Sequence, residues 1–120
     1  ETAPQIRTYA DANAAVTERF PGMHFVHTIN NACLTVWGIT IGGTDLGTVI
    51  SRTVAMGYDN DCTAATAGSI VGAVIGAERI DDHWVRPFSN TIHSYLKGIA
   101  SLPIDQVLDR FVAQKARVTG

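Results

Sequence analysis

The stretch that decides the fold is Gly57-Tyr58-Asp59-Asn60-Asp61-Cys62-Thr63-Ala64-Ala65-Thr66-Ala67-Gly68-Ser69-Ile70-Val71-Gly72-Ala73-Val74-Ile75-Gly76. It begins with an acidic turn, residues 57–61, that holds two carboxylates one residue apart. A run of small and apolar residues without charge or proline follows, from Cys62 to Ala77. That run is shorter than the roughly 20 residues that a membrane span needs. We therefore predict a central helix buried in a protein core.

Three glycines, Gly68, Gly72 and Gly76, recur at every fourth position of this predicted helix. This spacing places them on one face, where the absence of side chains lets another backbone come close. Each glycine costs up to about 1 kcal/mol relative to alanine, so packing has to recover the loss. We expect other helices to lie against this glycine face.

The composition indicates a folded chain that binds neither nucleic acid nor a membrane. The net charge is −2, from 9 basic and 11 acidic residues, and without a basic cluster nucleic-acid binding has no electrostatic support. Hydrophobic residues make up 46% and charged residues 17%, as in soluble globular domains. The two cysteines, Cys33 and Cys62, have no zinc-site spacing and favour a reducing, cytoplasmic setting.

The length permits one domain with a real core, since a chain of this size buries roughly two thirds of its unfolded surface. The sequence opens on Glu1 without a methionine. We expect residues 1–120 to be either a single all-α domain or a fragment of a larger one.

Hydrophobic periodicity predicts further helices on both sides of the decisive stretch. Pro21-Gly22 ends the first of them, Thr44 or Asp45 can cap the third, and Pro103 fits the first turn of the last. Valine, threonine and isoleucine leave a strand as an alternative for 33–41. The segment 88–98 fits no single element, and the predicted helices cover 6–20, 28–41, 46–56 and 103 onward.

The paired aspartates, Asp59 and Asp61, have two explanations. An aspartate before a helix accepts hydrogen bonds from free backbone amides and interacts well with the positive end of the helix dipole. Two carboxylates ahead of an apolar helix repel each other when drawn out of water, and a hard divalent cation would resolve that conflict. By composition alone, capping and metal binding both stay open.

The residues around the turn carry a more specific signal. Residues 57–73 resemble the C-terminal signature of the ADP-ribosylglycohydrolase family, a Gly-x-Asp-x-Asp turn that ends in Thr, Ser or Cys and precedes a small-residue helix. Residues 25–32 and 42–54 resemble segments that precede this signature in a microbial, dinitrogenase-reductase-activating-glycohydrolase-like branch. Residues 92–111 resemble the closing loop and helix. The resemblance covers most of the chain from about residue 24 onward.

This resemblance implies an all-α, orthogonal helical bundle that hydrolyses the glycosidic bond of ADP-ribosylated proteins or small ADP-ribosyl substrates. It implies a centre of two Mg²⁺ ions, or Mn²⁺ in some members, with Asp59 and Asp61 as ligands. Cys62 follows where the family usually supplies a threonine or serine hydroxyl. Because a thiol is a poor partner for magnesium, the ligand role of Cys62 is the weakest of the three.

The family's other metal ligands come from a Gly-Asp turn and a Thr/Ser-Asp-Asp run, and neither occurs in these 120 residues. The resemblance therefore implies a C-terminal portion that supplies half of the site, is inactive alone and is completed by an N-terminal portion. The general acid or base would lie in that portion, so no catalytic residue is assigned. The alternatives are a degenerate module that binds ADP-ribose or a related nucleotide without cleaving it, and a purely structural helical module.

Three residues are predicted to contact the substrate. His27 and Thr28 stand where the second helix begins, and helix N-termini receive phosphate or hydroxyl groups; the alternative is a capping threonine beside a partly buried histidine. Tyr58 either stacks on a ligand ring or closes the core beside Asp59.

Overall fold

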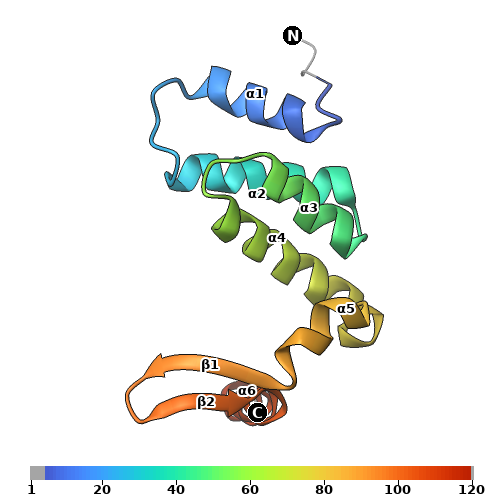
Figure 1. Ribbon diagram of the computed structural model, residues 1–120, viewed down its shortest axis with the longest axis vertical. Coiled ribbons are helices and arrows are strands. Elements are labelled where there is room, and N and C mark those ends of the chain that lie inside the picture. The colour runs from blue at the N-terminus through green and yellow to red at the C-terminus, as the bar shows by residue number, and fades with distance from the viewer. Residues whose placement is uncertain (1–4, 120) are drawn as a thin grey trace. The chain divides into compact units, whose positions relative to one another are not determined.

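Four helices form the first of two compact units, Glu1–Ile80. The structure, a computed structural model, describes residues 5–119. In Figure 1, α2, α3 and α4 run back and forth beside one another, and α1 packs on α2. The elements of this unit are α1 (Tyr9–Arg19), α2 (Thr28–Gly42), α3 (Leu46–Ala55), α4 (Asn60–Ile75) and the short 3₁₀ helix η1 (Ala77–Arg79).

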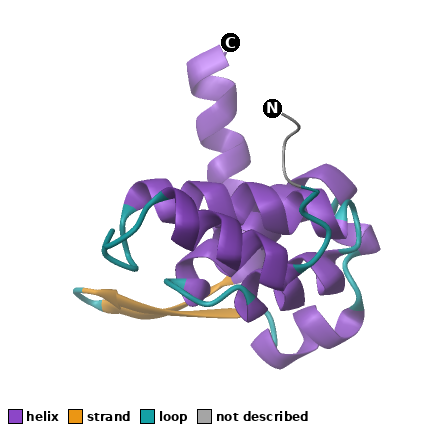
Figure 2. Cartoon of the chain, turned by 90° about the horizontal axis from the view of Figure 1, so that it is seen from above, coloured by secondary structure: helices purple, strands orange, loops and turns teal. Residues whose placement is uncertain are grey.

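The second unit, Asp81–Gly120, contains the single sheet of the described residues. Its two antiparallel strands are orange in Figure 2, with Thr91 opposite Pro103. The hairpin begins within the segment 88–98 that the sequence left unassigned, and Gly98 turns the chain with φ of +79°. It ends at Pro103, so the last helix starts one residue later than predicted. The elements of this unit are α5 (Asp82–Val85), η2 (Arg86–Phe88), β1 (Thr91–Leu96), β2 (Ile99–Pro103) and α6 (Ile104–Thr119).

Helix dominates the chain, which confirms the predicted all-α class with this hairpin as the exception. The alternative of a strand over 33–41 is wrong. The buried residues of α2 are Asn30, Leu34, Thr35 and Gly38, which fall at helical spacing on one face. Packing of this face against its neighbours therefore outweighs the strand propensity of the valine, threonine and isoleucine residues.

Threonine or aspartate side chains cap α1, α3 and α5. Thr8 and Asp11 form a reciprocal capping box at the start of α1, and Asp45 and Asp81 accept N–H hydrogen bonds at the starts of α3 and α5. The hydrogen bond with Thr8 holds the pKa of Asp11 below its ordinary value. A backbone N–H has the same effect on the pKa of Asp81. Aspartate side chains therefore cap more than one helix of this chain.

The core of the first unit consists of two clusters. The first joins α1, α2 and the end of α3, and the second joins α3 and α4, so α3 is shared by both. The buried members of the first cluster are Ala12, Val16, Leu34 and Met56. Those of the second are Val49, Ala67 and Val71.

The predicted burial of α4 in the core holds for one of its faces and not for the other. Ile70 and Val74 on the other side are exposed, Val74 by 69%. The buried residues of α4 are Thr63, Ala64, Ala67 and Val71. No helix within residues 5–119 is both long enough and apolar enough to cross a bilayer.

The glycine that lets two helix backbones approach closely is Gly42 of α2, and Gly38 on the same helix makes room for a side chain of α3. A Cβ atom on Gly42 would stand 2.7 Å from the backbone nitrogen of Val49, and one on Gly38 would collide with the hydroxyl of Thr53. On α4, by contrast, Gly68 is met by the side chain of Ile50, and Gly76 ends the helix with open space around it. The predicted close backbone packing on the glycine face of α4 is therefore wrong.

Candidate metal centre

The acidic turn links the end of α3 to the start of α4 through two successive left-handed residues. Gly57 has φ of +76° and Tyr58 has φ of +59°. Glycine adopts this conformation freely, whereas for a residue with a side chain it costs roughly 1–2 kcal/mol. Contacts outside the turn therefore have to hold Tyr58 in place.

Helix α1 supplies these contacts. The Nδ2 atom of Asn13 donates a hydrogen bond of 2.6 Å to the carbonyl oxygen of Met56, and the hydroxyls of Thr17 and Tyr58 lie 2.6 Å apart. Tyr58 also packs on the first core cluster. Two side chains of α1 therefore fix the residues on both sides of Gly57.

Asp59 occupies the N-cap position of α4 without acting as its cap. Its side chain accepts no hydrogen bond from the helix backbone, in contrast to Asp45 on α3. Its Oδ2 atom instead accepts a hydrogen bond of 2.6 Å from Nδ2 of Asn31, on the first turn of α2. The side chain of Asp59 therefore does not cap α4 in this structure.

Asp59, Asp61 and Cys62 form the group of potential metal ligands. One carboxylate oxygen from each aspartate and the Sγ of the cysteine all lie within 4.8 Å of one another. Asp59 is half-buried, whereas the other two residues are exposed. The structure thus brings together all three residues that the sequence singled out for a metal.

The donor set fits a hard cation through its carboxylates and not through its thiol. Carboxylate oxygens are the protein ligands that Mg²⁺ and Mn²⁺ prefer. A hydrogen bond with Asp59, and then the charges of Asp59 and Asp61, raise the pKa of the Cys62 thiol. Because cysteine binds metals as the thiolate, this environment disfavours Cys62 as a ligand.

Two of the predicted substrate residues, His27 and Thr28, lie at the start of α2. His27 is the N-cap of α2, where its Nδ1 accepts a hydrogen bond of 3.2 Å from the N–H of Ile29. The capping residue is thus the histidine and not Thr28, and both side chains are exposed. Asn31 lies one turn further along the same helix and joins this end of α2 to the acidic turn.

Tyr58 has structural partners at both ends of its side chain. Its ring packs on the first core cluster and its hydroxyl lies beside Thr17. These contacts match the alternative in which the tyrosine closes the core beside Asp59.

Asn31 was not predicted as the partner of Asp59. The two residues are 28 positions apart, so no local spacing pattern connects them. The available signal was the Asn30-Asn31 pair near the start of a helix without charged residues. Asparagine has low helix propensity, and its presence near a helix start suggests a specific hydrogen bond.

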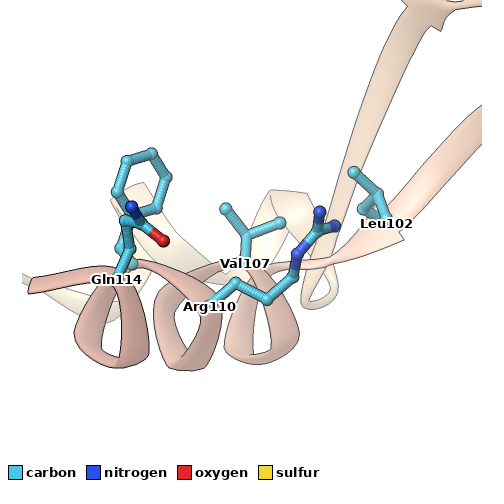
Figure 3. A pocket seen from close by; sticks show the side chains of 5 residues that line it. Leu102, Val107, Arg110 and Gln114 are labelled. Carbon is cyan, nitrogen blue, oxygen red and sulfur yellow. The ribbon is translucent and has the colours of Figure 1, made fainter. Parts of the chain in front are cut away.

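A hollow on the second unit offers no comparable chemistry (Figure 3). It lies over α6 and the end of β2, and no carboxylate, histidine or cysteine borders it. Its lining consists of Leu102, Val107, Arg110, Phe111 and Gln114. The acidic turn therefore remains the candidate for the metal site predicted from the sequence.

The fold and the turn together define an all-α protein with a carboxylate pair at a helix N-terminus. A sequence model of the family described as ADP-ribosylglycohydrolase matches residues 1–117. The chain therefore belongs to the ADP-ribosylglycohydrolase family, a family of hydrolases, as the resemblance predicted. Searches of curated proteins and of solved structures gave no match.

Proposed function

We propose that this chain contributes the acidic turn to a metal-dependent hydrolase that releases ADP-ribose from modified substrates. The observation that carries the proposal is the Asp59 carboxylate, which stands at the N-cap of α4 and leaves the helix backbone uncapped. A carboxylate in that place, with a second one beside it, is available to a cation. Family membership supports the hydrolytic reaction class.

Asp59 and Asp61 would hold Mg²⁺, or Mn²⁺ in its place. A bound cation of this kind orients hydroxyl groups and water and stabilises developing negative charge. The chain itself supplies the two carboxylates, and the positive end of the α4 dipole lies beside them, where it stabilises their charges. Cys62 is left out of this ligand pair because a thiol is a poor partner for Mg²⁺ and because the neighbouring Asp59 raises the pKa of this thiol.

The remaining ligands of a two-ion centre and the general acid or base would come from an N-terminal portion of the domain. The only group of three or more candidate ligands within residues 5–119 contains just two carboxylates. The Gly-Asp and Thr/Ser-Asp-Asp elements are absent from the 120 residues. The chain alone is therefore expected to be inactive.

The substrates would be ADP-ribosylated proteins or small ADP-ribosyl compounds. In the reaction, a water oxygen bonds to the anomeric carbon of the ribose while the bond from that carbon to the acceptor breaks. The anomeric carbon gains oxocarbenium character on the way. His27 and Thr28, both exposed at the start of α2, are the residues proposed to contact the substrate.

An assay of free ADP-ribose tests this function. The native gene product, incubated with an ADP-ribosylated protein and Mg²⁺ or Mn²⁺, should release ADP-ribose that chromatography detects. Chelation of the metal should stop the release, and added metal should restore it. Release that is insensitive to chelation would contradict the metal requirement, and binding without release would favour the second candidate below.

The second candidate is a protein that binds ADP-ribose without cleaving it, and Cys62 is the observation that favours it. A thiol stands where the family usually carries a hydroxyl, and its raised pKa keeps it neutral beside the carboxylates.

Changing Cys62→Thr separates the two candidates. A hydroxyl oxygen is a better partner for Mg²⁺ than a thiol. If the thiol disables the site, the variant should bind Mg²⁺ about tenfold more tightly and gain ADP-ribose release, a change in the range known for residues around a metal. Calorimetry and the release assay measure the two effects. No change in either would make Cys62 a residue without influence on the metal.

A further inference from the structure

The side chain of Asn31 connects two helix ends that are distant in the sequence. It projects from the first turn of α2, and its Nδ2 atom lies 2.6 Å from Oδ2 of Asp59 at the start of α4. A carboxylate only accepts hydrogen bonds, so the amide must present its NH₂ group to Asp59. The orientation of the Asn31 amide is therefore fixed by its partner.

This orientation leaves the Oδ1 atom of Asn31 buried without a hydrogen-bond partner. A buried oxygen in that state is unfavourable, and native proteins keep few of them. The neighbouring Asn30 also has an unpartnered Oδ1, but its Nδ2 donates to the backbone carbonyl of His24. Asn31 differs from it in donating to an ionisable side chain.

The hydrogen bond from Asn31 also affects whether Asp59 can cap α4. An aspartate at an N-cap normally accepts hydrogen bonds from the second and third residues of its helix, here Asp61 and Cys62. Asp45 accepts such a bond at the start of α3, whereas Asp59 accepts none from α4. Besides the thiol of Cys62, the Asp59 carboxylate thus has two competing partners, the amide of Asn31 and the backbone of α4.

We propose that Asn31 is a positioning residue that holds the Asp59 carboxylate off the backbone of α4 and so keeps it available to a divalent cation. The inference rests on the proposed function, because holding Asp59 off the helix matters only if its carboxylate binds a cation. Without the amide, the carboxylate would turn to the free N–H groups of α4. The start of α4 would then be capped by Asp59, and the Asp59 carboxylate would no longer be positioned to bind the cation.

The test uses the change Asn31→Ala in the native protein. In the metal-free state, hydrogen exchange at the amides of residues 61 and 62 should slow by about fivefold, the size expected for one side-chain cap. The affinity for Mn²⁺, measured by calorimetry, should fall about 10–100-fold, as for other residues that orient metal ligands. A residue that only supports the fold would speed exchange at these amides instead.

Two further variants make the result specific. Asn31→Gln retains an amide donor and should recover part of the Mn²⁺ affinity. Asn30→Ala changes the same residue type one position away and should leave the Mn²⁺ affinity unchanged without slowing exchange at residues 61 and 62.

Unchanged or faster exchange at residues 61 and 62 in Asn31→Ala would overturn the positioning role, as would an unchanged affinity for Mn²⁺. A native protein that takes up no Mn²⁺ would instead overturn the proposed metal site. In that case the exchange measurement alone would decide whether Asn31 holds Asp59 off the helix.

Discussion

Changing Asp59→Asn or Asp61→Asn should lower both divalent-cation uptake and ADP-ribose release by more than about 100-fold, the upper end of the effects seen for residues outside the ligand set. Each change replaces a charged oxygen donor by a neutral amide at the point where the two carboxylates converge. Calorimetry with Mg²⁺ and Mn²⁺ measures uptake in the native protein, and chromatography measures free ADP-ribose. Unchanged uptake would remove the residue from the ligand set.

The matched control is Asp45→Asn. Asp45 is also an N-cap aspartate, but it accepts a hydrogen bond of 2.8 Å from the N–H of Thr48 and lies outside the acidic cluster. Asparagine caps helices as well as aspartate does, so the stability and the cation affinity should both be retained. A second readout is thermal: Mg²⁺ should raise the melting temperature of the wild type and of this control, and not that of Asp59→Asn.

Changing Gly42→Ala should destabilise the first unit by about 1–3 kcal/mol, the usual cost of an extra methyl group in a packed interior. The new Cβ would stand 2.7 Å from the backbone nitrogen of Val49 and 2.8 Å from its Cα. Because these are backbone atoms of α3, a change of rotamer gives no relief. The midpoint of urea denaturation measures the loss.

Gly38→Ala should behave in the same way, with one difference. The obstructing group is the side chain of Thr53, whose hydroxyl donates to the carbonyl of Val49. Removal of that hydroxyl in Gly38→Ala/Thr53→Ala should therefore recover part of the loss. In Gly42→Ala the same second change should recover nothing.

Gly47→Ala is the control for both glycines. The nearest atom to its added Cβ is a carboxylate oxygen of Asp45 at 3.5 Å, an ordinary contact distance. With no clash, the better helix propensity of alanine should raise the stability by up to about 1 kcal/mol. Destabilisation by Gly47→Ala equal to that by Gly42→Ala would show that close packing of α2 on α3 is not the reason for the glycines.

These glycines also show how far the sequence could predict the fold. Gly68, Gly72 and Gly76 have the same four-residue spacing as Gly38 and Gly42 of α2, and close backbone packing was predicted for the set around α4. Spacing shows that a helix has a bare face, but not whether another backbone approaches it. That depends on the tertiary placement of α3, which no local pattern encodes.

The secondary structure could be predicted better than the packing of the helices, because its signals in the sequence are local. The helix predicted over 28–41 appears as α2, and the breaker pair Pro21-Gly22 lies between α1 and α2 as expected. The hairpin from Thr91 to Pro103 was missed. Its strands are short and bordered by a tight turn at Gly98, so they offer little periodicity to separate strand from helix.

The two aspartates of the candidate site could be predicted from the sequence because their pattern is also local. Asp59 and Asp61 are neighbours in the chain, and their pattern survives into the structure as a cluster. Asn31 reaches the cluster only through the packing of α2 against α4, so no local pattern in the sequence reveals its role.

The two hydrogen bonds from α1 to the acidic turn have a consequence for how the family varies. Asn13 and Thr17 carry no charge and lie on a different helix, yet they support the left-handed backbone on which the carboxylates are displayed. The geometry of the carboxylates therefore depends on a helix that supplies neither of them. An inventory of metal ligands alone would overlook these residues, and a homologue could keep both aspartates and still lose the geometry through drift in α1.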